Sequence, residues 1–333
     1  MKAMMLHKAT SVYDVPLQDS DISIPDPGDN EIRIQVNVCG VCRTDLHIIE
    51  GDLEIPKLPV IPGHQIVGIV DTVGKDVTKI KIGDRVGLPW MSSTCGDCNY
   101  CTNGQENLCD FAQFTGLHRD GGYAEIVVAP EQFVYRIPDG FPDDQVAPLL
   151  CAGIIGFRTL KQSNIQPGQR LGLHGFGASA HVTIQVARHW GCDVYVFTRS
   201  EDHQLHAEEL GAVWIGSAQS DPGVEMDASL VFAPVGWLLV EALKRVRKGG
   251  TVASAGIHMT PIPEFPYSLI YGERTVTTTA NATYEDGTEL LKLAKKIPIH
   301  TEIELYDLVN ANKALQDLKD SKFRGAAVLK IGD

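Results

Sequence analysis

Four of the eight cysteines fall within fifteen residues, and their spacing suits metal chemistry. They are Cys95, Cys98, Cys101 and Cys109, in the pattern C-x2-C-x2-C-x7-C. Gaps of two residues let successive thiolates converge on one point, and four thiolates complete the tetrahedron of a closed structural Zn²⁺ site. A redox or disulfide cluster is the alternative, but neighbouring sulfurs on one short loop would form strained disulfides. The spacing therefore predicts a structural zinc lobe.

A glycine-rich turn forms a second candidate site. Gly175, Gly177 and Ala180 follow a strand expected at 170–174 and open an expected helix. The first glycine of such a pattern makes a tight turn, and the second lets the backbone approach a pyrophosphate. The small third residue lets the helix pack closely on the strand. The pattern predicts dinucleotide binding, with a plain strand-to-helix turn as the alternative.

The end of the next expected strand, 193–198, should contact the adenosine ribose of the dinucleotide. This end carries Thr198, Arg199 and Ser200, with no acidic residue before Glu201. A guanidinium suits a 2′-phosphate, whereas NAD sites usually place a carboxylate there. We therefore favour NADP over NAD, and a merely solvated arginine is the alternative.

Two kinds of scaffold must position these residues. The first half of the chain holds short β-like runs between Gly, Pro and Asp, at 31–38, 65–73 and 123–129, which predict a β-rich, partly barrel-like unit. Farther on, strands at 170–174, 193–198, 229–233 and 251–255 alternate with helices, which run from the glycine-rich turn to about 190, at 201–210 and at 238–247. This alternation predicts an α/β domain with a doubly wound parallel sheet. Helices at 287–296 and 310–319 precede a last strand at 326–331.

Length and charge limit the classes of protein. A chain of 333 residues is long enough for two domains, since single cores rarely grow beyond about 250 residues. A net charge of −13 without a Lys/Arg stripe argues against a nucleic-acid surface. The start of the chain lacks a signal-peptide pattern, and no run approaches the roughly 18 apolar residues of a membrane span. We expect a cytoplasmic protein with small-molecule partners.

The remaining cysteines and one histidine are weak signals when taken singly. Cys42 follows an expected strand, His64 precedes the next one, and Cys151 lies at the expected domain junction. A lone cysteine is usually part of the core, and we assign Cys39 and Cys192 to the core on that ground.

Taken together, these motifs resemble zinc-dependent alcohol dehydrogenases of the medium-chain dehydrogenase/reductase superfamily over essentially the whole chain. In family order they are Gly-Val-Cys42-x-Thr-Asp, Gly63-His64, Gly83-Asp84-Arg-Val, the four-cysteine lobe, Cys151-Ala-Gly and the glycine-rich turn. The resemblance implies a GroES-like catalytic domain at 1–152, a Rossmann domain at 153–281 and a return to the catalytic domain at 282–333.

The resemblance also implies a second, catalytic Zn²⁺ bound by Cys42, His64 and Cys151, with water or substrate in the fourth position. Thr44 then corresponds to the hydroxyl that touches the substrate oxygen, and His47 to the terminal proton acceptor of a relay.

Other positions match supporting residues of the family. Asp45 matches the carboxylate that orients the ligand histidine. Arg43 and Arg324 match residues that bind the cofactor pyrophosphate. Trp90 matches a pocket aromatic residue that would narrow the site toward small or slim alcohols and aldehydes.

One position departs from the family pattern. The residue after the ligand histidine is usually Glu, and here it is Gln65. A neutral amide removes a negative charge near the metal and cannot serve as a transient carboxylate ligand. We expect a more electropositive metal site that still catalyses, because the three ligands are present.

The sequence thus predicts an NADP(H)- or NAD(H)-dependent alcohol dehydrogenase and aldehyde reductase with two zinc ions per chain. A zinc-free quinone or enone reductase of the same superfamily is one alternative, although it needs no thiolate ligands. A non-catalytic dinucleotide-binding sensor is the other. Family members of this length imply a homo-oligomer, with a tetramer favoured over a dimer.

Overall fold

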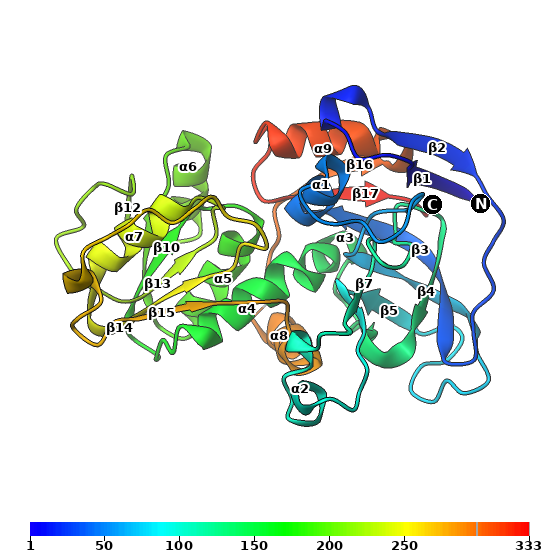
Figure 1. Cartoon of the computed structure of the whole chain (residues 1–333), viewed down its shortest axis with the longest axis horizontal. Helices are drawn as coiled ribbons and strands as arrows, with labels where there is room; N and C mark the ends of the chain where they lie inside the picture. Colours follow the sequence, from blue (N-terminus) through cyan, green and yellow to red (C-terminus); the bar gives the residue numbers. More distant parts are fainter. Residues whose placement is uncertain (298, 333) are drawn as a thin grey trace. The chain divides into compact units, whose positions relative to one another are not determined.

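Two units make up the described chain, residues 1–297 and 299–332, in this computed structural model (Figure 1). The first unit consists of Met1–Cys151, Thr283–Lys295 and Thr301–Asp333. The second consists of Ala152–Ala282 and Lys296–His300. The chain therefore leaves its β-rich unit after Cys151, returns to it at Thr283, and contributes one more short segment to the second unit before Thr301.

A seven-stranded sheet forms the framework of the first unit. The strand order is β16-β17-β3-β4-β5-β9, and β8 also pairs with β3. The bounds are β3 Glu31–Val41, β4 Ile66–Val73, β5 Arg85–Leu88, β8 Ile126–Pro130, β9 Tyr135–Arg136, β16 Ile303–Asp307 and β17 Ala326–Lys330. Register shifts between Arg33 and Ile34 and between Val36 and Val38 interrupt the pairing of β3 with β4. Such bulges bend a strand. The strand β3 is long enough to pair with β8 over residues 31–35 and with β17 over residues 38–41, in addition to β4, and the unit is β-rich as the sequence predicted.

Smaller elements complete the first unit. They are β1 Lys2–Leu6, β2 Leu17–Asp21, β6 Met91–Ser93, β7 Gln113–Phe114, α1 Arg43–Glu50, α2 Asn99–Thr102, α3 Asp143–Val146, α8 Tyr284–Lys296 and α9 Ala311–Lys319, with short 3-10 turns at 12–14, 106–108, 131–133, 147–150 and 308–310. No helix of the described residues is both long enough and apolar enough to cross a membrane.

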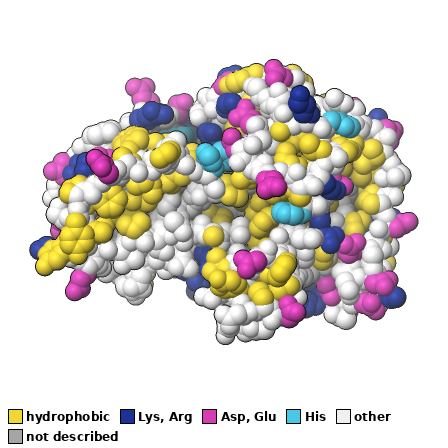
Figure 2. Space-filling view, viewed as in Figure 1, with side chains coloured by type: hydrophobic (Ala, Val, Ile, Leu, Met, Phe, Trp, Pro, Cys, Tyr) yellow, Lys and Arg dark blue, Asp and Glu magenta, His cyan; other side chains and the backbone are white. Residues whose placement is uncertain are grey.

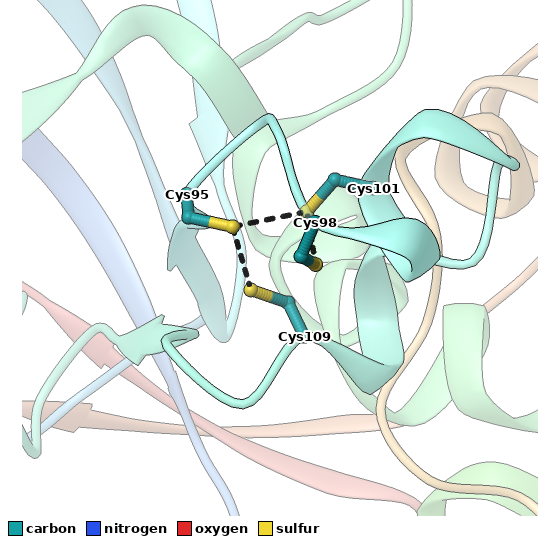
Figure 3. Close-up of side chains that lie close together, drawn as sticks. All are labelled: Cys95, Cys98, Cys101 and Cys109. Atoms are coloured by element: carbon teal, nitrogen blue, oxygen red, sulfur yellow. Dashed lines mark hydrogen bonds between the residues drawn. The ribbon is translucent and has the colours of Figure 1, made fainter.

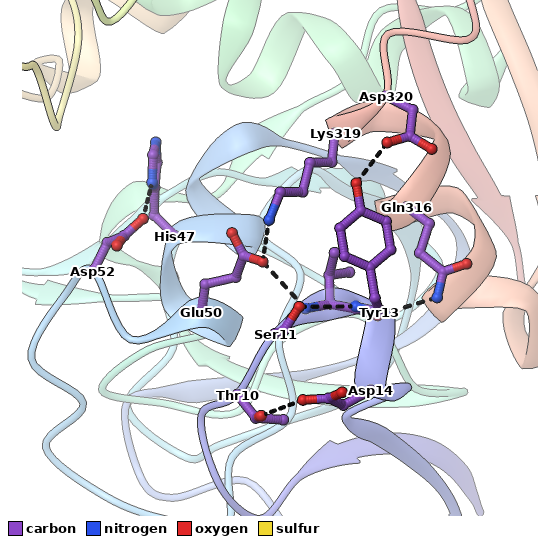
Figure 4. A network of polar contacts seen from close by, with 11 residues as sticks. Thr10, Ser11, Tyr13, Asp14, His47, Glu50, Asp52, Gln316, Lys319 and Asp320 are labelled. Atoms are coloured by element: carbon purple, nitrogen blue, oxygen red, sulfur yellow. Dashed lines mark hydrogen bonds and ion pairs between the residues drawn. The ribbon is translucent and has the colours of Figure 1, made fainter.

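Helix α1 is held at its C-terminal end by a network of polar contacts (Figure 4). Glu50 accepts hydrogen bonds from the backbone N–H of Val12 at 3.1 Å and from Nζ of Lys319 at 2.5 Å. Gly51 ends the helix with φ of +80°, a conformation that glycine adopts without a Cβ penalty. The helix is therefore fixed against both the first 3-10 turn and α9.

The second unit is a six-stranded, fully parallel sheet with the order β12-β11-β10-β13-β14-β15. Numbered from β10, this is the order 3-2-1-4-5-6 of dinucleotide-binding sheets, so the doubly wound prediction is confirmed. The bounds are β10 Arg170–His174, β11 Asp193–Phe197, β12 Trp214–Gly216, β13 Met226–Val231, β14 Val246–Ser254 and β15 Thr275–Thr278, with α4 Ala152–Gln162, α5 Ala178–His189, α6 Glu201–Glu209 and α7 Gly236–Arg245 and a 3-10 turn at 267–269.

One stretch of the second unit differs from the sequence prediction. The sequence predicts a helix to 247 and a strand from 251. The helix α7 ends at Arg245 instead, and Gly249 and Gly250 lie inside β14. Gly249 has φ of +73°, and the pairing of β13 with β14 is irregular there, so the glycines form a bulge rather than a turn.

Two buried histidines of the second unit have ring nitrogens without hydrogen-bond partners among the described residues: His174 and His181. His174, at the end of β10, stacks on Phe197 with ring centroids 4.3 Å apart. His181, in α5, lies 5.5 Å from the ring of His206. Burial lowers the pKa of each to about 3, and the charge of Arg245 adds to this effect for His174. Both imidazoles are therefore neutral in the folded protein.

These histidines predict a loss of stability in acid. Their folded pKa lies below the ordinary value of about 6.5, so the unfolded chain takes up protons first as the pH falls. Stability is full above about pH 6.5 and declines toward pH 3, by roughly 2 kcal/mol per histidine at pH 5. In His174→Leu, about one proton fewer should bind on unfolding, so the unfolding free energy should fall less between pH 7.5 and pH 5. Urea unfolding at the two pH values measures this. His189→Leu, at an exposed position of α5, is the matched control. An equal pH dependence in wild type and His174→Leu would contradict the argument.

Candidate functional site

The four cysteines of the lobe converge on one point (Figure 3). Their sulfurs lie within 4.8 Å of one another, and three pairs are 3.5, 3.5 and 3.8 Å apart. Zn–S bonds of about 2.3 Å place the sulfurs of a tetrahedral site about 3.8 Å apart. The spacing fits a four-coordinate metal, and all eight cysteines are free thiols. Four sulfurs fill a tetrahedral zinc shell, so this group fits a closed site.

A second group joins three residues that lie far apart in the sequence. Cys42 Sγ is 3.8 Å from Cys151 Sγ, and the ligand atoms of Cys42, His64 and Cys151 all lie within 4.8 Å. His64 is fully buried, and its Nε2 has no hydrogen-bond partner among the described residues. A buried, unpaired imidazole nitrogen beside two thiols is the donor set of a three-ligand zinc site with one open position.

The three side chains of this group shift one another's pKa values. The hydrogen bond from Cys151 lowers the pKa of Cys42 well below the ordinary value, and His64 adds to this effect. The same bond raises the pKa of Cys151. Burial lowers the pKa of His64, but the charges of Asp45 and Cys42 and the hydrogen bond to Asp45 outweigh it and raise this pKa to about 10. The lowered pKa of Cys42 favours its thiolate, the form in which a cysteine binds a metal.

Asp45 connects the ligands to the backbone. It is fully buried, and its Oδ1 accepts from Nδ1 of His64 at 2.9 Å and from the N–H of Gly63 at 3.2 Å. Its Oδ2 accepts from the N–H of Cys42 at 2.9 Å, which caps the first turn of α1. This bond pattern turns Nε2 of His64 toward the two sulfurs.

Two candidate relay residues lie on the same helix, α1. Thr44 is buried, and its Oγ1 is 3.8 Å from Sγ of Cys42. His47 is mostly buried, and its Nδ1 is 2.8 Å from Oδ2 of the half-exposed Asp52 (Figure 4). Asp52, the partner of His47, is not predicted by the sequence motifs. An acidic residue just beyond a glycine that ends the helix was the available signal.

Trp90 forms an aromatic wall beside the three-ligand group. Its ring packs edge-on against His64, with centroids 5.0 Å apart, and stacks on Phe114 at 4.7 Å. His118 extends the row at 5.3 Å from Phe114. Phe114 and His118 were missed because β6 and β7 pair only in the folded chain.

Gln65 is buried, and its side chain packs on Gly40, where an added Cβ would come within 2.9 Å of Oε1. Cys39 and Cys192 are buried and lie in neither cysteine group.

The glycine-rich turn of the second unit has the predicted shape. Gly175 has φ of +88° and packs against Ala233, so a side chain there would be strained. A Cβ on Gly177 would meet nothing within 4 Å, which leaves the N-terminus of α5 open on that side. Ala180 is fully buried under the helix. An open helix N-terminus behind a glycine turn fits a pyrophosphate.

The end of β11 carries Thr198, Arg199 and Ser200. Thr198 is buried, and its carbonyl accepts from Nε2 of Gln204 at 2.9 Å. Ser200 caps α6 by accepting from the N–H of His203. Arg199 between them is exposed.

The two other predicted cofactor arginines lie in the first unit. Arg43 is the exposed first residue of α1. Arg324 is half-buried, and its Nε is 2.9 Å from Oε1 of Glu302, a partner that the sequence analysis did not identify.

Comparison with known proteins places the chain in a family. The Alcohol dehydrogenase GroES-like domain family matches residues 28–139, and the Zinc-binding dehydrogenase family matches residues 180–296. The chain is 42% identical to the probable alcohol dehydrogenase AdhA of Mycobacterium tuberculosis, over 99% of this chain and 97% of that protein.

Solved structures agree with this assignment. A cinnamyl alcohol dehydrogenase of Sorghum bicolor superposes with a TM-score of 0.90 at 28% identity, covering 98% of this chain and 97% of that one. The enzyme CAD from Helicobacter pylori, solved with NADP(H), superposes with a TM-score of 0.87 at 27% identity, covering 99% of both chains. The chain therefore belongs to the zinc-dependent alcohol dehydrogenases of the medium-chain superfamily and is an oxidoreductase of that class.

Proposed function

We propose that this protein interconverts small primary alcohols and aldehydes with NADP(H), using one catalytic and one structural zinc ion. The observation that carries the proposal is the three-ligand group of Cys42, His64 and Cys151, whose ligand atoms lie within 4.8 Å and leave a tetrahedral metal one open position. Cys95, Cys98, Cys101 and Cys109 would hold the structural ion, with no position left for a substrate.

The side chains around the open site suggest how the reaction proceeds. When bound, zinc would act as a Lewis acid on the substrate oxygen, and the nicotinamide would accept or deliver hydride. Thr44, next to Cys42 on α1, would hydrogen-bond the substrate oxygen and pass its proton on. His47, paired with Asp52, would hand that proton to solvent. Asp45 would keep His64 in the orientation that metal binding needs.

Dinucleotide binding is assigned to the second unit. The turn of Gly175, Gly177 and Ala180 would receive the pyrophosphate at the open end of α5. Arg43 and Arg324 remain proposed contacts of the pyrophosphate from the first unit. For Arg324 this requires the guanidinium to share or leave its ion pair with Glu302.

The preference for NADP is argued from the end of β11. Arg199 is exposed there. The side chain of the next residue, Ser200, is engaged as the N-cap of α6. Acidic side chains begin only at Glu201, within the helix. A guanidinium binds a 2′-phosphate with charge-assisted hydrogen bonds. The Helicobacter pylori relative, solved with NADP(H), is in accord with this preference.

The substrate class is argued from the aromatic wall. Trp90 lies against the ligand His64 and stacks on Phe114, so these two rings form an apolar surface beside the three-ligand group. Such a surface favours slim substrates, including flat aromatic alcohols and aldehydes, over bulky polyols. A cinnamyl alcohol dehydrogenase among the solved relatives supports this class. We propose aldehyde reduction with NADPH as the working direction.

A homo-oligomer is proposed from the surface of the second unit. The strand β15 pairs only with β14 among the described strands, and Val276 on it is 41% exposed. Tyr267 and Tyr271 nearby in sequence are about 70% exposed. Figure 2 shows hydrophobic side chains gathered on this unit. Pairing of two β15 edges would cover them, with a tetramer favoured over a dimer.

Eight free thiols accord with the reducing cytoplasm as the proposed location of the protein.

The two alternatives make different demands on the three-ligand group. A zinc-free quinone or enone reductase has no use for two thiols and an unpaired imidazole around one point. A non-catalytic sensor would bind the dinucleotide without turning over a substrate. Metal content and turnover therefore distinguish all three functions.

Replacing one ligand tests the role of the metal. The variant Cys42→Ala should lose one of two zinc ions per chain and at least about 1,000-fold in kcat/KM, or roughly 4 kcal/mol of transition-state stabilisation. Elemental analysis and aldehyde-dependent oxidation of NADPH give the two readouts. Cys192→Ala, which removes a buried thiol outside both groups, should keep zinc and activity. One zinc or none in the wild type would favour the reductase alternative instead.

Charge reversal at Arg199 tests the cofactor assignment. Arg199→Asp should lower the preference for NADP over NAD by about 10- to 150-fold, since a charge-assisted contact is lost and a repulsion is added. The ratio of kcat/KM for NADPH and NADH is the measurement. The same reversal at the exposed Lys248 should leave the ratio unchanged. An unchanged ratio in Arg199→Asp would show that this residue is only solvated.

A substrate panel tests the proposed class. We expect slim aliphatic and flat aromatic aldehydes to be reduced faster than polyols or bulky ketones are converted, with NADPH more effective than NADH. The variant Trp90→Ala removes the indole ring and should widen the substrate site. It should raise KM for small aldehydes and admit bulkier ones, as measured by kcat/KM across the panel. Turnover of quinones alone would refute the proposed reaction.

A further inference from the structure

The carboxylate of Asp45 receives a fourth hydrogen bond, from a residue that neither the sequence motifs nor the family comparison singled out. The hydroxyl of Tyr123 donates to Oδ2 of Asp45 at 3.2 Å. The other donors are the imidazole of His64 and the backbone N–H groups of Gly63 and Cys42. Tyr123 is thus the side-chain donor on the Oδ2 side of the carboxylate, opposite His64.

The position of Tyr123 is set by backbone contacts. Tyr123 is fully buried, and its N–H donates to the carbonyl of Pro62 at 3.0 Å. Gly121 and Gly122 donate in the same way to Ile61 at 2.7 Å and to Gly63 at 3.0 Å. The segment 121–123 therefore lies along the loop 61–63 that leads into His64.

The fit of the ring requires a glycine in that loop. Gly63 has φ of +97°, and a Cβ built on it would collide with the ring of Tyr123. The ring therefore lies directly over the residue before His64. Burial and the carboxylate of Asp45 raise the pKa of Tyr123, so the hydroxyl keeps its proton and can only donate here.

We propose that Tyr123 is a positioning residue for the open metal site, acting through Asp45. Its hydroxyl fixes the plane of the carboxylate, so that one oxygen faces the N–H of Cys42 and the other faces Nδ1 of His64. The two ligands then converge before a metal arrives. Loss of the hydroxyl removes one of the two donors to Oδ2, so the carboxylate is held less firmly and metal retention weakens at this site alone. The inference rests on the proposed zinc site and adds a residue to it.

The test is the rate of zinc release to a chromogenic chelator from the zinc-loaded full chain. Outer partners of metal ligands typically contribute 10- to 100-fold in metal affinity. Because Tyr123 contacts Asp45 and not a ligand itself, Tyr123→Phe should release one zinc about 3- to 10-fold faster than wild type, a smaller effect than loss of Asp45 would have. The zinc of the four-cysteine lobe serves as the internal standard, and its release should not change.

Tyr306→Phe is the matched control. Tyr306 also donates its hydroxyl to a carboxylate, Oδ2 of Asp317 at 3.1 Å, and neither residue belongs to either metal-binding group. It should leave both release rates at the wild-type values. Equal rates in Tyr123→Phe and wild type would overturn the proposal, and so would an equal acceleration in both tyrosine variants.

A double-mutant cycle tests the route through Asp45. In an Asp45→Asn background, Tyr123→Phe should add less than about twofold to the release rate. The full factor in that background would overturn the proposal. Wild-type protein that holds zinc only in the four-cysteine lobe would instead refute the proposed function, a result read before any variant is made. Where Asp45→Asn yields no folded protein, the visible spectrum of Co²⁺ at the open site is compared between Tyr123→Phe and wild type. A changed spectrum is expected, and identical spectra would overturn the proposal.

Discussion

The buried carboxylate of Asp45 is the interaction on which the site depends. A charge without solvent is stable only when its lone pairs are filled, and four donors surround this one. Two of them belong to Cys42 and His64 themselves, and a third to the residue before His64. The hydrogen bonds that satisfy the carboxylate are therefore also the ones that align the metal ligands. The bulged strand β3, the start of α1 and the loop before β4 all lead into it.

The two metal-binding groups of the first unit differ in their number of ligands, and this number distinguishes a structural site from a catalytic one. Four thiols on one loop use every tetrahedral position and can only hold the lobe together. Two thiols and an imidazole, brought from three segments, leave one position free. In this open group the buried Nε2 of His64 has no hydrogen-bond partner among the described residues, and a bound metal would satisfy it.

Much of this could be predicted from the sequence where the information is local. The cysteine spacing, the glycine turn after β10 and the alternation of strands and helices each depend on neighbouring residues. Gly249 and Gly250 were misplaced because a glycine pair suits a turn and a bulge equally, and only the pairing with β13 decides. Tyr123, Asp52 and Glu302 could not be found, because their contacts with Asp45, His47 and Arg324 arise only when distant segments fold together.

The most direct test of the account is the anomalous scattering of a crystal of the full chain, measured on both sides of the zinc absorption edge. Two peaks per chain are expected. One lies among Cys95, Cys98, Cys101 and Cys109 with four sulfur ligands, and one lies among Cys42, His64 and Cys151 with a non-protein ligand in the fourth position. A single peak in the four-cysteine lobe would contradict it, since the buried ligands around Asp45 would then have another purpose.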